Sequence, residues 1–321
     1  MTRVEKIRKR IADETSALLI TSDSNRLYAS GFKSSAGFML VSKNECNLYL
    51  DSRYCEMAKI AKSQGKLQSE TMVFPIERKR REYISDFCER NKIKTLLCED
   101  RSLTVYQYSQ LEGETSGICK ISGMGNLLED CRVSKDEGET ELIKKAQKIT
   151  DMAFSHILGY ITPNVTEMDV ALELEYFMRK NGAESTAFET ICVSGTKSSL
   201  PHGKPENIKL GKGFFTMDYG AKYQGYCSDM TRTVCIGRPT DEMKRVYDTV
   251  FEAQKRAFNE IAAGITGKSV DAAARDYIYS QGYKGCFGHG LGHSLGIDIH
   301  ESPNFSPSCD IEIPKGAILS V

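Results

Sequence analysis

The first third of the chain alternates short apolar runs with segments of helical period. Apolar residues at positions 4, 7 and 11 predict a helix over residues 4–12. The run "ALLIT" (17–21) predicts a buried strand, and "SDSN" after it predicts a turn. "GFMLVS" and "NLYLD" predict a hairpin around "KNEC", and "TLLCED" predicts a further strand. We therefore expect an α/β domain over residues 1–125.

The remainder, residues 126–321, begins with long helical patterns and continues with strands. Ser134 and Glu137 fit a capping box, which predicts a helix from residue 134 through 158. A second helix is expected from Thr166 to Gly182. The later patterns predict strands over 189–195, 213–220 and 225–237, helices over 241–263 and 269–281, and a last apolar run, "GAILSV". The fold class expected for the whole chain is therefore mixed α/β (α+β).

Length and charge limit the possible classes of protein. The 321 residues are 40% hydrophobic, enough for two domains with their own cores. Lys+Arg and Asp+Glu are 43 each, which argues against a nucleic-acid partner bound through a broad basic surface. The basic run "ERKRRE" (77–82) is flanked by acids and is interpreted as a solvated helix face.

Cysteine usage and hydropathy bear on the compartment. The eleven cysteines are scattered without a CxxC pair, which favours free thiols in a reducing cytoplasm. The charged N-terminal segment "MTRVEKIRKRIADE" does not resemble a signal peptide. The absence of an 18-residue apolar run predicts no membrane partner.

Two aspartates eleven residues apart mark the first candidate site. If the segment 213–237 is a hairpin that turns at Tyr223–Gln224, Asp218 and Asp229 face each other with Cβ atoms about 4.5–5.5 Å apart. Carboxylates in that position repel, so either one is protonated or a cation lies between them. The alternative is an ordinary hairpin with two solvent-facing aspartates, and a slip of one residue would move the side chains to opposite faces.

Three of the five histidines lie in "GHGLGHSLGIDIHESP", at positions 289, 293 and 300. The glycines exclude a stable helix, and in an extended chain His289 and His293 share a face. Imidazole together with the two carboxylates suits Mn or Co, with Zn or Fe as further possibilities. Hydrogen-bonded core or surface histidines are the alternative. His202, in the loop "SSLPHGKP", is by itself most simply a surface residue.

Together these motifs resemble those of the pita-bread metallopeptidases, which include aminopeptidase P, prolidase and the metal-free relative creatinase. "DYGAKYQGYCSDMTRTV" is similar to their first metal motif, "GHGLGHSLGIDIHESP" to their histidine motif, and "ETICVSGTKSSLPHG" to the stretch with a substrate-side histidine. "NRLYASGFKSSAGFMLVSKNECNLYLDSRY" resembles the creatinase/prolidase N-terminal domain, which methionine aminopeptidases lack. The resemblance covers nearly the whole chain, and implies a creatinase-like domain over 1–125 and a pita-bread domain over 126–321.

The resemblance implies a metal-dependent Xaa-Pro aminopeptidase or dipeptidase. Two divalent ions, foremost Mn, would activate the water that attacks the peptide bond before proline. The homodimer typical of the family is also expected. The roles that the resemblance implies are Asp218, Asp229 and His293 as metal ligands, His202, His289 and His300 as catalytic groups that contact substrate, and Thr231 as a partner of the bridging Asp229.

One departure from the family pattern affects the expected activity. The family has two glutamate ligands beyond the histidine motif, and the sequence ends at Val321, where the first is expected. We therefore expect a pita-bread domain cut short at its C-terminus, and weak or no activity of the 321-residue chain. A non-catalytic binding module on the same fold and a metal-free, creatinase-like hydrolase remain as alternatives.

Overall fold

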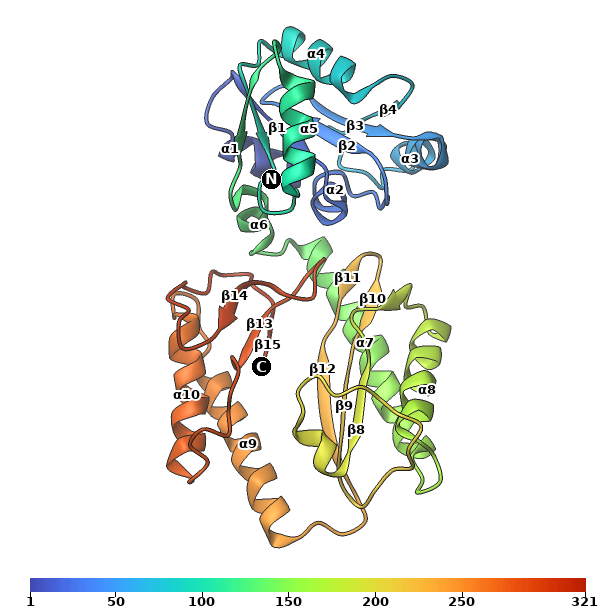
Figure 1. Cartoon of the computed structure of the whole chain (residues 1–321), viewed down its shortest axis with the longest axis vertical. Helices are drawn as coiled ribbons and strands as arrows, with labels where there is room; N and C mark the ends of the chain where they lie inside the picture. The colour runs from blue at the N-terminus through green and yellow to red at the C-terminus, as the bar shows by residue number, and fades with distance from the viewer. The chain divides into compact units, whose positions relative to one another are not determined.

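The computed structural model describes residues 1–321, which divide into two compact units, Met1–Arg132 and Val133–Val321 (Figure 1). Both units combine helices with strands, which confirms the mixed α/β class. The boundary expected from the sequence, between residues 125 and 126, lies just before the last helix of the first unit. No helix is both long and apolar enough to span a bilayer.

Unit 1 is built on a six-stranded sheet in the order β4-β3-β2-β1-β5-β6. Its strands are β1 (Ser16–Ile20), β2 (Phe38–Val41), β3 (Cys46–Leu50), β4 (Met72–Pro75), β5 (Thr95–Cys98) and β6 (Lys120–Gly123). Its helices are α1 (Arg3–Arg10), α2 (Asp23–Ser30), α3 (Ser52–Ser63), α4 (Arg80–Asn91), α5 (Val105–Thr115) and α6 (Leu127–Arg132). Every residue of the central strands β1, β2 and β3 is buried, because helices cover both faces of the sheet.

The structure confirms most of the elements predicted for unit 1, including the first helix and the β2–β3 hairpin. The turn predicted at "SDSN" is wrong, because Ser22 accepts a hydrogen bond from the Asn25 amide and so caps α2 instead. The basic run over 77–82 is a solvated segment at the start of α4, where Arg78 pairs with Asp86 at 2.9 Å.

Unit 2 contains two similar helix pairs. They are α7 (Glu137–Tyr160) with α8 (Glu167–Lys180), and α9 (Asp241–Glu260) with α10 (Gly267–Ser280). The second helix of each pair is capped by a threonine, Thr166 or Thr266, which also forms an isolated bridge to a later segment. The same cap at the same place indicates that unit 2 is an internal repeat of one helix-pair motif.

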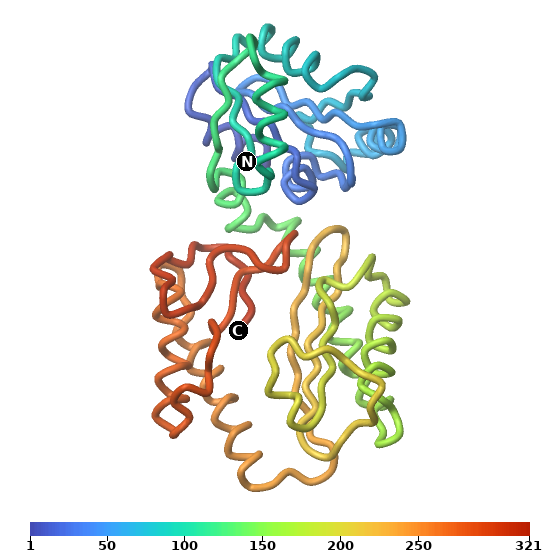
Figure 2. The backbone as a smooth tube through the Cα atoms, in the orientation of Figure 1, coloured from blue at the N-terminus to red at the C-terminus, as the bar shows by residue number.

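The strands of unit 2 form three small antiparallel sheets. In Figure 2 the red C-terminal segment that contains β13, β14 and β15 runs apart from the yellow segment that contains β8 to β12. Their orders are β11-β10-β7, β12-β9-β8 and β14-β13-β15. The strands are β7 (Ser185–Thr186), β8 (Ile191–Ser194), β9 (Gly213–Tyr219), β10 (Ala221–Tyr223), β11 (Tyr226–Cys227), β12 (Met230–Ile236), β13 (Gly292–Ser294), β14 (Glu301–Phe305) and β15 (Leu319–Ser320). One apolar core joins α7 and α8 to β8 and β9, and another joins α9 and α10 to β14.

The helices and strands expected in this part of the chain are present, but the capping box lies two residues later than predicted. Asp136, not Ser134, accepts from the Glu139 amide, and the Glu139 carboxylate accepts from the Asp136 amide. The Ser134 hydroxyl instead donates to the Lys315 carbonyl at 2.9 Å. Both pairs satisfy the sequence pattern, and the tertiary contact of Ser134 decides between them.

Candidate active site

The hairpin that carries the two aspartates turns one residue later than predicted. Gln224 and Gly225 both have positive φ, 46° and 87°, as expected of a two-residue hairpin loop of the primed type. The ladder therefore places Asp218 of β9 opposite Thr231 of β12. The predicted direct pairing of Asp218 with Asp229 is wrong, since Asp229 lies just before the start of β12.

A buried polar network fixes the irregular segment that contains Asp229. The Thr150 hydroxyl of α7 contacts the Ser228 hydroxyl at 2.7 Å, and both accept from the Ala221 amide, at 3.0 and 2.9 Å. Gly220 lies against the Ser228 carbonyl, which occupies the position that a Cβ would need. Only glycine permits this approach, so the break between β9 and β10 is set by the sequence.

Asp218 is electrostatically strained. Its Oδ1 is buried without a hydrogen-bond partner. Burial, and then the negative charge of Asp229, raise the pKa of Asp218 to about 6, against the opposing hydrogen bond from Thr231. Thr231 therefore supports Asp218, its ladder partner. The two carboxylates interact as predicted, although not as a directly opposed pair.

His293 of β13 lies beside Asp229. Its Nε2 is 3.4 Å from Asp229 Oδ2, which also accepts from the Ser320 hydroxyl of β15 at 2.9 Å. The His293 ring meets that of His300 edge to face, with centroids 4.4 Å apart. Burial, and then His293, lower the pKa of His300, which favours its neutral form. Two strands, β9 and β13, and the two loops that precede β12 and β14 thus bring together Asp218, Asp229, His293 and His300.

His202 lies on an exposed loop and interacts electrostatically with Asp218. Its positive form is one of the influences that lower the pKa of Asp218. The loop begins with the short helix η1 (Gly195–Ser199), which the buried Glu167 anchors. The Glu167 carboxylate accepts from the Ser194 amide at 2.7 Å and from Lys197 Nζ at 2.8 Å.

His289 lies apart from the other candidate residues. Its exposed ring contacts the Gly290 carbonyl at 2.7 Å and the edge of Phe287, with centroids 5.0 Å apart. Arg275 fixes the loop by donating to the buried Asp271 at 2.6 Å and to the carbonyls of Phe287 and His289. The face expected to be shared with His293 does not form, because His289 precedes β13 in a non-repetitive loop.

The donor set fits a divalent metal in chemistry but is not preassembled. Asp218 offers a buried, unpartnered oxygen, and carboxylates with one imidazole suit Mn or related ions. No group of three or more His, Cys, Asp or Glu side chains already converges as a metal-binding cluster. Asp218, Asp229 and His293 are the residues whose chemistry could hold such an ion.

Some residues of the site give no signal in the sequence. Ser320 is part of an apolar run, yet it hydrogen-bonds Asp229. Thr150 is 78 positions from Ser228, with which it fixes the segment before β12. Only the three-dimensional packing places these hydroxyl groups at the site.

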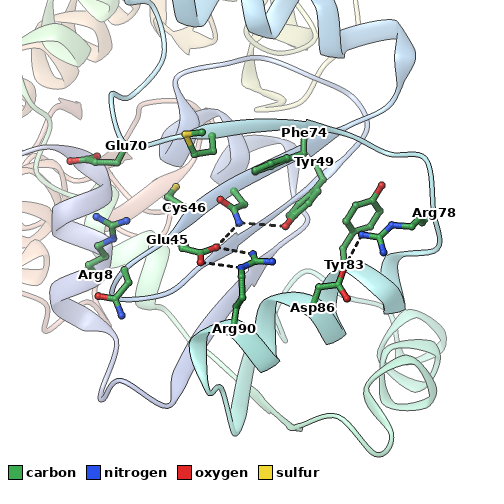
Figure 3. A pocket seen from close by; sticks show the side chains of 13 residues that line it. Arg8, Glu45, Cys46, Tyr49, Glu70, Phe74, Arg78, Tyr83, Asp86 and Arg90 are labelled. Carbon is green, nitrogen blue, oxygen red and sulfur yellow. Dashed lines mark hydrogen bonds and ion pairs between the residues drawn. The ribbon is translucent and has the colours of Figure 1, made fainter.

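A cavity in unit 1 lies elsewhere and has different chemistry (Figure 3). It measures about 490 Å³ and contains none of the candidate site residues. Tyr49 and Phe74 stack on its wall, with centroids 5.5 Å apart. Arg90 pairs with Glu45 at 2.9 Å, and Figure 3 shows that Arg78 also faces an acid. The thiol of Cys46 also lines the cavity, and burial raises its pKa to about 11, which favours the unreactive protonated form.

Two known families match consecutive parts of the chain. The pattern of Metallopeptidase family M24 matches residues 141–321, and that of the Creatinase/Prolidase N-terminal domain matches residues 3–134. The chain therefore belongs to metallopeptidase family M24 and carries a creatinase/prolidase N-terminal domain. This confirms the resemblance read from the sequence motifs.

Relatives match over almost the whole chain. An Xaa-Pro dipeptidase of Pyrococcus horikoshii is 34% identical over 99% of this chain and 88% of its own length. The structure of an Xaa-Pro dipeptidase from Bacillus anthracis is 36% identical, with a TM-score of 0.91 over 99% of this chain and 88% of that one. That of an X-Pro aminopeptidase from Thermotoga maritima is 35% identical, with a TM-score of 0.89 over the same shares.

Proposed function

We propose that the protein is a metal-dependent Xaa-Pro peptidase that hydrolyses the bond before proline in a dipeptide or a longer peptide. Its family membership and the names of its relatives support this activity. The observation that carries it is the buried, unpartnered Oδ1 of Asp218, held near Asp229 and His293. A buried anionic oxygen without a partner is costly, and a bound cation would relieve that cost.

We propose that Asp218, Asp229 and His293 contribute ligands to two divalent ions, foremost Mn, with Co, Zn or Fe as alternatives. Such ions, when bound, supply an activated water and polarise a carbonyl. The Ser320 hydroxyl orients one oxygen of Asp229, and Thr231 orients Asp218. These contacts leave the opposite oxygens of both carboxylates for metal.

The remaining histidines would act on the substrate. His300, kept neutral by burial, can donate one hydrogen bond to an oxygen that gains negative charge in the transition state. His202 lies on a loop that the Glu167 carboxylate holds through Ser194 and Lys197, and is suited to orient the peptide. His289 would reach a substrate from its exposed loop, because the Arg275 contacts hold that loop in place.

Assembly, compartment and the activity of the isolated polypeptide are further parts of this proposal. We propose a homodimer in a reducing cytoplasm, where the eleven free cysteines would persist as thiols. A polypeptide of residues 1–321 alone supplies three of the five metal ligands that the family resemblance implies. We therefore expect it to hold metal weakly and to hydrolyse peptides slowly or not at all.

The test compares this polypeptide with a fusion in which the corresponding C-terminal segment of the Bacillus anthracis dipeptidase follows Val321. Both are assayed with Mn²⁺ on Ala-Pro, Ala-Pro-Ala and the control Ala-Ala. We expect the fusion to cleave only the bonds before proline, and Asp229→Asn in the fusion to abolish cleavage. A fusion that binds Mn²⁺ but cleaves Ala-Ala as fast as Ala-Pro would refute the proposed specificity.

The second candidate is a non-catalytic binding module on the same fold. The lack of a preassembled cluster of three or more metal-ligating side chains favours it. It predicts that the fusion binds Xaa-Pro peptides without metal and without cleavage. Cleavage without any metal would instead indicate a creatinase-like hydrolase.

A further inference from the structure

One buried lysine bonds the residues that directly follow two histidines of the site, His293 and His300. The Lys135 side chain is 1% exposed and its partner Glu301 is 8% exposed, with Nζ and Oε2 3.1 Å apart. The same ammonium group donates to the Ser294 hydroxyl at 3.0 Å and to the Val133 carbonyl at 3.3 Å. Burying a charged amine costs free energy, and its bonds to these partners offset that cost and hold the ammonium group in place.

The partners of Lys135 are the chain neighbours of the two histidines. Ser294 directly follows His293, and Glu301 directly follows His300. Ser294 and Glu301 face each other across the β13–β14 ladder, where a register shift separates His293 from Ser294. The ladder is irregular at this point, and the lysine adds a side-chain link between the two strands next to the bulge.

Two further contacts extend this connection. The Ser294 hydroxyl donates to the Ile318 carbonyl at 2.9 Å, next to the β15 strand that contributes Ser320. Glu301 Oε1 accepts from the Asp298 amide at 3.1 Å, within the loop between the two histidines. Lys135 therefore fixes β13, the loop after it and the start of β14 with one charged group.

We propose that Lys135 is a positioning residue that sets the spacing of His293 and His300. It acts through Ser294 and Glu301, the chain neighbours of the two histidines. Its value to the reaction rests on the roles given to the two histidines in the proposed function. The spacing itself, 4.4 Å between ring centroids, is a property of the protein without metal or substrate.

The test uses the 321-residue chain in three variants. Lys135→Met removes the connection and with it the ion pair of Glu301 with Lys135. Lys135→Met with Glu301→Gln removes the connection and the unbalanced charge together. Arg26→Met is the matched control, because Arg26 is a comparably buried cation, 2% exposed, paired with Asp23 in unit 1.

Two measurements report the spacing without any catalytic assay. Histidine-selective NMR is simple in a chain with five histidines, and a ring-to-ring NOE between His293 and His300 measures their proximity. Titration calorimetry with Mn²⁺ alone measures metal affinity. We expect both lysine variants to lose the NOE and to bind Mn²⁺ about 10–100-fold more weakly, as for other residues that orient metal ligands. Arg26→Met should lower stability and change neither measurement.

Two results would overturn the proposal. One is a Lys135→Met variant that keeps the NOE and the wild-type Mn²⁺ affinity. The other is a double variant that shows the wild-type NOE and the wild-type Mn²⁺ affinity, because Lys135 would then serve only to neutralise the charge of Glu301. If Lys135→Met does not fold, the same two measurements on the double variant test the proposal. If wild-type protein shows the NOE but its fusion cleaves no Xaa-Pro bond, the proposed function fails while the positioning role stands.

Discussion

Substituting Asp218 by asparagine should stabilise the metal-free protein while abolishing its metal response. The pKa of Asp218 is raised from 3.8 to about 6, chiefly by burial. Folding therefore favours the protonated form. The stability is fully present below pH 3.8, and is lost as the pH rises through about 6.

The change in the pKa of Asp218 sets the size of the effect. Raising that pKa from 3.8 to about 6 corresponds to about 3 kcal/mol at most. Solvent reaches part of the site, so we expect Asp218→Asn to gain about 1–2 kcal/mol in free energy of unfolding at pH 7.5. The gain should shrink towards zero near pH 4, where the wild-type carboxyl is largely protonated.

Urea unfolding in EDTA at pH 7.5 and pH 4 measures this difference, with Asp310→Asn as the control because the Asp310 side chain is 81% exposed. Added Mn²⁺ should then stabilise the wild type at pH 7.5 and leave Asp218→Asn unchanged. The reasoning is refuted if Asp218→Asn is no more stable than wild type at pH 7.5, or if its gain is the same at both pH values.

Two other substitutions test how the scaffold holds the site. Gly220→Ala places a Cβ against the Ser228 carbonyl, so we expect a clear fall in melting temperature and weaker Mn²⁺ binding. Gly113→Ala, with open space around it inside helix α5, should keep or raise the melting temperature and leave Mn²⁺ binding unchanged. Arg275→Met leaves the buried Asp271 carboxylate unpaired and should cost about 3–5 kcal/mol. It should also make residues 287–291 sensitive to protease; resistance equal to wild type would contradict the anchoring of the His289 loop.

Apolar periodicity and capping predicted the element order, because these signals are local. Thr166 caps α8 as expected, since its partner Asp169 lies within the same helical turn. Asp136 was missed in favour of Ser134 because both have an acid three residues later, and only the distant Lys315 carbonyl distinguishes them. Local rules therefore left an ambiguity that tertiary contacts resolve.

In the candidate site, too, the sequence reveals the local signals and not the tertiary contacts. The histidine-rich motif and the two aspartates were visible in the sequence, as residue types that bind metal at close spacing. The register was not, because moving the turn to Gln224–Gly225 brings Thr231 opposite Asp218. Lys135 was invisible, since its partner Glu301 lies 166 positions away and nothing local marks a lysine as buried.

The measurement that tests the account most directly is an anomalous difference map from crystals of the fusion protein soaked in Mn²⁺. The account predicts manganese peaks within bonding distance of Asp218, Asp229 and His293, with Lys135 still bound to Glu301. Peaks located elsewhere, or none at full Mn²⁺ saturation while these three side chains are ordered, would contradict the proposed metal site.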